Sequence, residues 1–146
     1  MVPRCGSSKL TGNAGANVLT GGAGNDSLTG GGDADGLWGG TGADRFIYTV
    51  LNDSTPGLRD TIYDFSHSES DRIDLSAIDA IVGGKGGKND AFTWGGADTP
   101  TANGVWYSES AGHTDVHADV NGDTIADLQI TLVGTGLGLI AADFIL

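Results

Sequence analysis

A glycine-rich repeat of nine residues constrains this 146-residue chain more than any other feature. Four consecutive units cover residues 12–47 and read GNAGANVLT, GGAGNDSLT, GGGDADGLW and GGTGADRFI. Their shared template is Gly-Gly-x-Gly-x-Asp-x-apolar-x, and a partial unit, GSSKLT, precedes them. A flexible linker has no reason to keep an acid or amide at position six and a large apolar residue at position eight. We therefore expect an ordered repeat structure.

The chemistry of one unit predicts a metal-binding turn followed by a very short strand. The apolar residue at position eight stands between two neighbours outside the core, which suits a strand. The glycines allow positive φ angles and close backbone approach. Backbone carbonyls and the position-six carboxylate can then converge, and such hard oxygen ligands suit Ca²⁺. Because each unit reverses the chain once, an ion should lie between units one and three and between units two and four.

The net charge of the chain also favours a cation as its binding partner. The chain has 19 acidic and 7 basic residues and a net charge of −12, which argues against nucleic acid and anionic membranes as partners. It has no run of 18 apolar residues, so we expect no membrane insertion. Cys5 is the single cysteine, so no intrachain disulfide can form. Residues 1–11 are interpreted as a partial repeat or as the remnant of a protease site from an expression vector, without a signal peptide of the usual kind.

The composition changes beyond Phe46, where short β-branched and aromatic segments alternate with turn signals. We expect antiparallel strands within 45–51, 60–65, 71–78, 91–94, 104–108, 114–120, 125–134 and 143–146. A hairpin is expected around Asn121-Gly122, and residues 75–82 are the one candidate for a helical turn or two. The predicted fold class is all-β, with a parallel β-roll over 12–47 that continues into an antiparallel β-sandwich over 48–146, which caps it.

The downstream segments RDTIYDFSHSESDRIDLSAIDA, ADVNGDTIADLQITLVG and AADFIL, together with the repeats, resemble the C-terminal RTX domain of serralysin-type secreted metalloproteases. The resemblance covers nearly all of residues 12–146; similar repeats occur on alginate epimerases and some lipases. It implies a calcium-loaded roll, an upstream catalytic domain and an extracellular protein that a bacterium secretes through a type I ABC exporter. The export signal would be the terminal Asp143-Phe144-Ile145-Leu146, with little effect on the stability of the loaded domain.

The resemblance also implies a ligand set for at least two calcium ions, with a third near Asp60 and Asp71. Asn17 is neutral and weakens its site, while Asp33 either restores charge there or distorts the turn. The position-six ligands are Asn17, Asp26, Asp35 and Asp44. The carbonyl ligands fall on Gly12, Ala14, Gly21, Ala23, Gly30, Gly32, Gly39 and Thr41, with Gly22, Gly24, Gly31, Gly40 and Gly42 facing the neighbouring ion.

Other groups of residues give weaker evidence for a binding site. The segment Asp119-x-Asn121-x-Asp123-x-x-x-Asp127 begins like an EF-hand, but it lacks the glycine at position six and the glutamate at position twelve. We favour a hairpin turn with solvated carboxylates. The three tryptophans are assigned to the core or the roll edge rather than to a sugar platform.

No catalytic constellation is found. His113 and His117 would lie on one strand face about 13 Å apart, too far to share a metal, and no His-Glu-x-x-His zinc motif occurs. Together with this absence, the resemblance implies a non-enzymatic calcium-binding module that folds on Ca²⁺ after secretion and exports and stabilises an attached enzyme, most simply a serralysin-like metalloprotease. The alternative is a carbohydrate-binding or adhesive module, such as that of an alginate epimerase.

Overall fold

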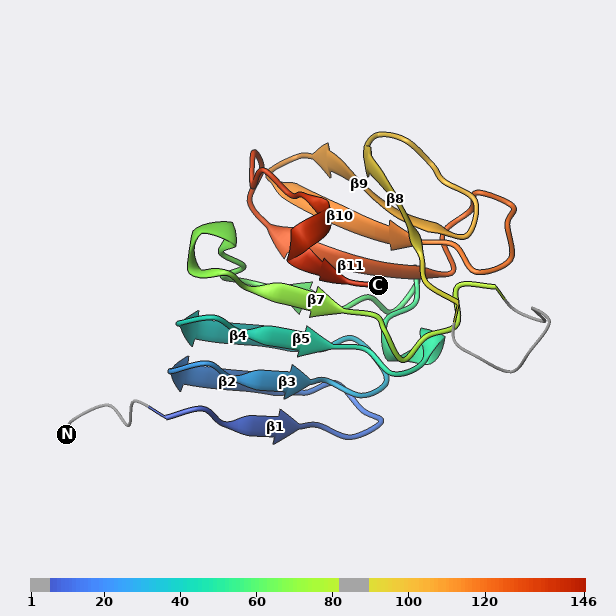
Figure 1. Cartoon of the computed structure of the whole chain (residues 1–146). Coiled ribbons are helices and arrows are strands. Elements are labelled where there is room, and N and C mark those ends of the chain that lie inside the picture. Colours follow the sequence, from blue (N-terminus) through green and yellow to red (C-terminus); the bar gives the residue numbers. More distant parts are fainter. Residues whose placement is uncertain (1–5, 82–89) are drawn as a thin grey trace.

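The first half of the chain alternates between two sheets, strand by strand. The computed structural model describes residues 6–81 and 90–146. The strands of this half are β1 (Lys9–Thr11), β2 (Val18–Ala23), β3 (Ser27–Thr29), β4 (Gly36–Thr41), β5 (Arg45–Ile47), β6 (Thr61–Ile62) and β7 (Arg72–Asp74). β1, β3, β5 and β7 pair in parallel in one sheet, and β2, β4 and β6 pair in parallel in the other. Two units thus make one coil of a parallel β-roll, and the coils stack from β1 upward (Figure 1).

The apolar residues at position eight fill the space between these two sheets. Leu28, Leu37 and Phe46 are at most 1% exposed, and Leu10 pairs directly with Leu28 across β1 and β3. The parallel pairing extends beyond residues 12–47 at both ends, because β1 precedes the four units and β6 and β7 follow them. Leu19, in β2 at the open edge, is only partly buried.

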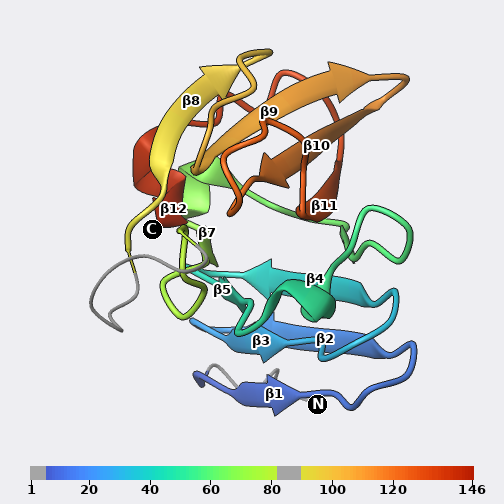
Figure 2. The same ribbon diagram turned by 90° about the vertical axis from the view of Figure 1, so that its right-hand side faces the viewer.

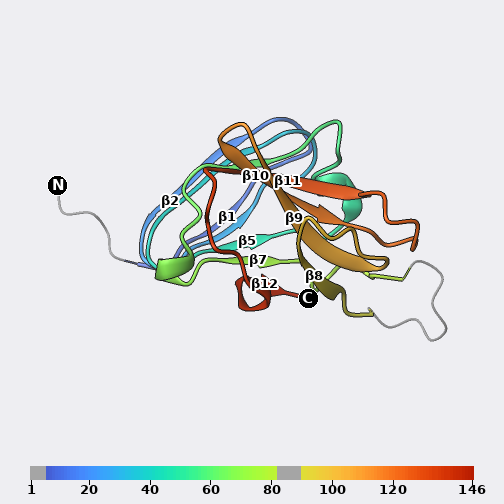
Figure 3. The ribbon, with the colours of Figure 1, turned by 90° about the horizontal axis from the view of Figure 1, so that it is seen from above.

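The second half continues the same two sheets instead of starting new ones. Its strands are β8 (Thr93–Ala97), β9 (Gly104–Ser110), β10 (His113–Ala118), β11 (Leu128–Val133) and β12 (Phe144–Ile145). One sheet has the order β1-β3-β5-β7-β12, and the other has the order β2-β4-β6-β11-β10-β9-β8. β9, β10 and β11 are antiparallel and lie over the end of the roll (Figure 2). The view from above shows the two sheets facing each other across the core (Figure 3). The predicted all-β fold class is confirmed, and each expected segment contains a strand. The expectation that these later strands are antiparallel is wrong for β6, β7, β8 and β12, which pair in parallel. β6 and β7 do so because the chain continues to coil past residue 47.

Two local expectations differ from the structure. Residues 75–81 form turns and no helix, while residue 82 lies outside the described residues. The remaining helical pieces are the short 3-10 helices η1 (Leu51–Asp53), η2 (His67–Glu69) and η3 (Ala141–Asp143). The hairpin of β10 and β11 exists, but Ala118 pairs with Leu128, so residues 119–127 form a long loop and not a tight turn. Among the described residues, no helix is long and apolar enough to cross a bilayer.

Candidate calcium-binding roll

The position-six residues lie in two rows, one along each edge of the roll. We call Asn17, Asp35 and Asp60 the Asp35 row, and Asp26, Asp44 and Asp71 the Asp44 row. Within each row, Oδ1 of one carboxylate accepts the backbone N–H of the member one coil earlier. These hydrogen bonds measure 2.7 Å from Asn17, 2.9 Å from Asp35, 2.8 Å from Asp26 and 2.9 Å from Asp44. The two rows arise because each repeat unit lies beside the unit two further along the chain, as the sequence predicts.

Each row holds buried carboxylate oxygens without a partner. Asp26, Asp35, Asp44 and Asp60 are at most 3% exposed, and in each of them Oδ2 makes no hydrogen bond. A buried ionised oxygen with neither a hydrogen bond nor a counter-charge is strongly unfavourable. A cation bound beside these oxygens would remove that cost.

The turns have no room for side chains at their tightest points, where oxygen atoms crowd around the glycines. A Cβ on Gly21 would lie 2.5 Å from Asp26 Oδ2 and 2.5 Å from the carbonyl oxygen of Gly39. Gly40 has a φ of 100°, and a Cβ there would collide with the carbonyl oxygen of Gly22. Carboxylate and carbonyl oxygens of units two and four therefore converge beside these glycines, which is the hard oxygen environment that Ca²⁺ prefers.

The other turn residues expected as ligands are brought together in the same way. A Cβ on Gly12 would collide with Asn17 Oδ1 and the Gly30 carbonyl oxygen. A Cβ on Gly30 would likewise meet Asp35 Oδ2, and a Cβ on Gly39 would meet Asp44 Oδ2. The carbonyls of Gly22 and Gly24 face Gly40 and Gly42, and the Asn13 carbonyl faces Gly31. Three carbonyls already accept backbone hydrogen bonds: Ala23 from Gly6, Thr41 from Gly24, and Asn13 from Gly32. A Cβ on Gly32 would lie 3.7 Å from the Ala14 Cα.

The electrostatics of both rows favour a positive charge. Burial raises the pKa of Asp60 to about 7, and the neighbouring carboxylates of Asp35 and Asp53 add to this. Burial likewise raises the pKa of Asp71 to about 6, with a contribution from Asp44. The pKa values of Asp35 and Asp44 are also raised, first by burial and then by nearby acids. A cation beside these carboxylates would favour their ionised form and lower these pKa values.

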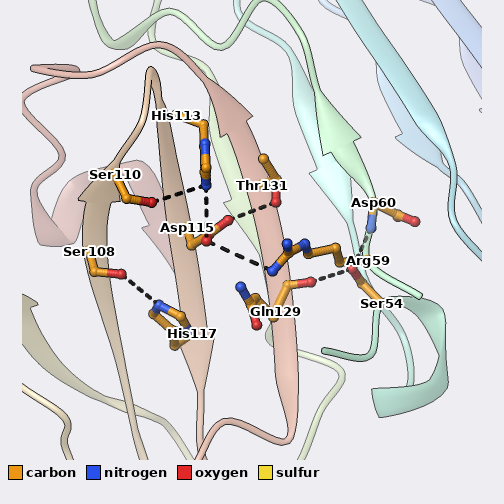
Figure 4. Close-up of polar contacts among 10 residues, drawn as sticks. All are labelled: Ser54, Arg59, Asp60, Ser108, Ser110, His113, Asp115, His117, Gln129 and Thr131. Carbon is orange, nitrogen blue, oxygen red and sulfur yellow. Dashed lines mark hydrogen bonds and ion pairs between the residues drawn. The ribbon is translucent and has the colours of Figure 1, made fainter. Parts of the chain in front are cut away.

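Asp60 and Asp71 end different rows, which differs from the expectation of one ion near both. The backbone N–H of Asp60 donates to Ser54 Oγ at 2.8 Å, and Ser54 Oγ donates to the Gln129 carbonyl at 2.6 Å (Figure 4). Asp60 is thereby fixed to β11 of the cap. Oδ2 of Asp71 accepts the Ser66 N–H at 2.8 Å, so this carboxylate has no unpaired oxygen.

Sequence reasoning missed Asp64, which lies at the end of the Asp44 row. Its two carboxylate oxygens accept the backbone N–H groups of Gly39 and Gly40, both at 2.9 Å. Its charge also raises the pKa values of Asp44 and Asp71. The only signal was its place in TIYDF directly after a strand, where it falls outside the nine-residue phase. A second missed group is Tyr48, whose buried hydroxyl lies beside the Asp60 carboxylate, and whose pKa is raised first by burial and then by Asp60.

Asn17 and Asp33 depart from the repeat template, and each changes only the contacts of its own turn. Asn17 exchanges hydrogen bonds with Asn13: its Oδ1 accepts the Asn13 N–H at 2.6 Å, and its Nδ2 donates to Asn13 Oδ1 at 3.4 Å. Asp33 stands where the template has glycine and adopts that residue's left-handed conformation, with a φ of 76°. Its exposed carboxylate accepts the N–H of Ala34 at 3.0 Å.

The loop 119–127 is organised by a buried carboxylate. Asp119 is 0% exposed and accepts backbone N–H groups from Asn103, Asn121, Gly122 and Thr124 at 2.9–3.2 Å. Burial alone would raise the pKa of Asp119, but these four hydrogen bonds hold it below its usual value. The expectation of solvated carboxylates is wrong for Asp119, because the backbone N–H groups of the loop take the place of water.

The outer face of β9, β10 and β11 carries a polar cluster that is not a catalytic triad (Figure 4). His113 Nε2 lies 3.2 Å from Ser110 Oγ and 3.4 Å from Asp115 Oδ2. A triad needs the serine and the acid on opposite ring nitrogens, and here one nitrogen faces both. Asp115 also accepts from Thr131 Oγ1 at 2.7 Å. Among the described residues, no three His, Cys, Asp or Glu side chains gather as a metal-binding group, in keeping with sites built mainly from backbone carbonyls.

Comparison with known families decides the assignment of this roll. Residues 11–146 match the model described as Peptidase M10 serralysin C terminal. The chain belongs to the serralysin C-terminal family. As a serralysin C-terminal domain it is a non-catalytic RTX calcium-binding module, of a kind that belongs to secreted proteins. The comparison with curated protein sequences gave no match.

Two solved structures are similar to this serralysin C-terminal domain. One is the solution structure of the AlgE6R2 subunit from the Azotobacter vinelandii mannuronan C5-epimerase, with a TM-score of 0.64 and 25% identity over 95% of this chain and 86% of that chain. The AlgE6R3 subunit of the same epimerase gives a TM-score of 0.58 and 26% identity over 94% of this chain and 77% of that one.

Proposed function

We propose that calcium ions bind along both rows and that this binding folds the roll after export. The observation that carries the proposal is the set of buried, unpartnered Oδ2 atoms of Asp26, Asp35, Asp44 and Asp60. Asp26 with Asp44, and Asn17 with Asp35, would hold one ion each through their side chains and the turn carbonyls. Asp60 would extend the Asp35 row, and Asp64 with Asp71 would extend the Asp44 row. Bound Ca²⁺ supplies the positive charge that these oxygens lack.

Folding and calcium binding would then be one equilibrium. Each repeat buries one apolar side chain, while its glycines lose more conformational freedom on folding than any other residue. Acids along each row repel one another without a cation. Extracellular calcium modules have Kd values of about 10⁻⁴–10⁻³ M, far above cytosolic calcium. The chain would stay unfolded inside a bacterium and thread a type I ABC exporter, then fold outside and stabilise an attached enzyme, such as a serralysin-like metalloprotease.

A calcium titration followed by circular dichroism tests this. We expect a cooperative gain of β-signal that a chelator reverses and that Mg²⁺ reproduces poorly, since Mg²⁺ demands a smaller, strictly octahedral site. An intact roll in the chelated protein, seen as protected amides in 18–47 by hydrogen exchange, would contradict the proposal. Calorimetric titration gives the number of ions, for which we expect at least three.

A second candidate function is that of a carbohydrate-binding module. The likeness to two modules of a mannuronan C5-epimerase favours it. It does not compete with calcium-driven folding, because a folded roll is the scaffold for either function. Binding of saccharides by the calcium-loaded domain tests it.

A further inference from the structure

A row of basic side chains crosses the outer face of the five-stranded sheet. Lys9 pairs with Ser27, Ser27 with Arg45, and Arg45 with Arg72, so these four residues, which we call the basic row, lie side by side on β1, β3, β5 and β7. The three cations are exposed. Among the lysines and arginines that the structure describes, only Arg59 lies elsewhere, next to the opposite sheet.

The row concentrates like charges that the fold itself does not neutralise. Neighbouring strands lie about 4.8 Å apart, and like charges placed directly across them are destabilising. Arg45 forms an ion pair with Asp74 at 2.5 Å. Within the described part of the chain, Lys9 and Arg72 have no acidic partner. Two cations at the ends of one row thus remain unpaired although the chain has a net charge of −12. An anionic ligand could pair with both of them.

The basic row is tied to the calcium sites by sequence position. Ser27, Arg45 and Arg72 each directly follow a member of the Asp44 row. Lys9 follows Ser8, whose N–H donates to Asp26 Oδ1 at 2.6 Å. Ions bound along the Asp44 row would neutralise the carboxylates behind the basic row and fix its spacing. The face would thus be positive and regular only in the calcium-loaded state.

The surroundings of the row suit a sugar chain. Thr11 and Thr29 stand two residues further along β1 and β3, on the same face, and pair with each other. An open cavity of about 340 Å³ adjoins Arg45 and Arg72 and is also lined by Ala43, Asp44, Ser70 and Ile145. Cations and hydroxyls at strand spacing match a linear polymer that carries one carboxylate and several hydroxyls per unit.

We propose that the basic row binds a linear polyuronate when the roll is loaded with calcium. Arg45 and Arg72, on neighbouring strands, meet adjacent carboxylates, and Lys9, two strands from Arg45, meets a carboxylate further along the polymer. Ser27, Thr11 and Thr29 meet hydroxyls. The proposal rests on calcium-driven folding, whereas calcium-driven folding does not depend on it. Binding weakens with added salt, because the contacts are between exposed charges.

The test measures binding of a short, soluble 1,4-linked uronate oligomer to the whole chain by calorimetry in calcium. The double variant Lys9→Gln/Arg72→Gln weakens binding by roughly three- to tenfold, the range for two exposed ion pairs. Arg59→Gln, which removes one positive charge near the other sheet, leaves binding unchanged. Ser27→Lys completes the row and tightens binding. Circular dichroism confirms that each variant keeps the calcium midpoint of the parent.

Three results would overturn the proposal. The first is a loaded, folded domain that shows no saturable binding of the oligomer, which would leave calcium-driven folding untouched. The second is the same loss of binding per charge removed in Arg59→Gln, which removes one charge, as in the double variant, which removes two; this would reduce the effect to net charge. The third is equal, row-dependent binding of poly-glutamate or anionic vesicles, which would show that the row accepts any polyanion. A neutral oligosaccharide of the same linkage is expected not to bind.

Discussion

The backbone N–H of Asp26 donates a 2.8 Å hydrogen bond to Oδ1 of Asp44, one coil further along the chain. This contact gives the two oxygens of the Asp44 carboxylate different roles. Oδ1 joins one coil to the next through the backbone, and Oδ2 is left buried without a partner. The same division recurs at Asp35, whose Oδ1 accepts from Asn17. A row of position-six acids therefore aligns the coils and offers one free oxygen per turn to a cation.

Removal of a buried carboxylate should weaken calcium binding more than removal of the amide in the other row. Asp26→Ala takes away a charged oxygen that has no other partner, whereas Asn17→Ala takes away a neutral group already bonded to Asn13. We expect the calcium midpoint to rise about tenfold in Asp26→Ala and by less in Asn17→Ala, because ligand charge tunes such sites. Calorimetric titration measures both, with the exposed Glu109→Ala as the control. Equal effects of Asp26→Ala and Asn17→Ala would contradict the assignment.

Calcium affinity should rise with pH. The pKa of Asp60 is about 7 and that of Asp71 about 6 in the ion-free fold, above their ordinary value of 3.8. The ion-free fold thus binds more protons than the unfolded chain, and its stability falls as pH rises from about 4 to about 7. Calcium binding displaces these protons, so affinity should increase by up to about tenfold per pH unit for each proton released, and level off above about pH 8. Titrations in buffers of different ionisation enthalpy count the protons. A midpoint that is constant between about pH 5 and pH 8 would refute this.

The parts that the sequence could predict share one property, which is periodicity. The nine-residue phase placed Asp26, Asp35 and Asp44 on the correct edges of the roll, and the alternation of short apolar segments located the later strands. Asp64 lies outside that phase, and only the fold brings its carboxylate to Gly39 and Gly40. The role of Asp119 depends on backbone N–H groups that converge once the loop 119–127 has formed. Contacts set by loop geometry leave no repeating signal in a sequence.

Restoring the template at position 33 should stabilise the roll. Asp33 holds a φ of 76°, a conformation that glycine adopts at no steric cost. Its charge also raises the pKa of Asp35, after the larger effect of burial. Asp33→Gly is therefore expected to raise the free energy of unfolding by about 1 kcal/mol, the lower end of the left-handed penalty, because Asp tolerates this conformation better than most residues. Asp33→Asn, which keeps the tolerance for this conformation but loses the charge, separates the two effects. If both variants weaken calcium binding, Asp33 supplies charge to its site instead of straining the turn.

The loop 119–127 should be stabilised by Asp119 and not by calcium. Asp119→Ala leaves four backbone N–H groups without their acceptor, which is expected to lower the free energy of unfolding by about 1–3 kcal/mol. Asp123 is exposed, and Asp123→Ala should change stability little. Chemical denaturation of the calcium-loaded protein compares the two variants. A loss of one bound ion in Asp123→Ala would instead support an EF-hand-like site.

The C-terminus should affect both stability and export. Phe144 is 6% exposed and packs in the core, and β12 pairs with β7 directly after Asp71. Asp143 Oδ1 lies 2.6 Å from His67 Nδ1, while its Oδ2 accepts the Ile140 N–H at 2.8 Å. These contacts argue against the expectation that the last residues matter little for stability. Deletion of 144–146 should lower the free energy of unfolding of the loaded domain by about 1.5–3 kcal/mol through Phe144 alone.

Export can be separated from stability because the exporter would act on the unfolded chain. His67→Ala removes the contact to Asp143 and leaves the terminal sequence intact, so it should lower stability and leave secretion unchanged. Deletion of 143–146 should abolish secretion by a co-expressed type I exporter. Secreted protein is measured in the medium against total expression, and stability is measured by denaturation of the purified, calcium-loaded domain. Secretion that falls in proportion to stability in both variants would show that the terminal residues serve the fold and carry no export signal.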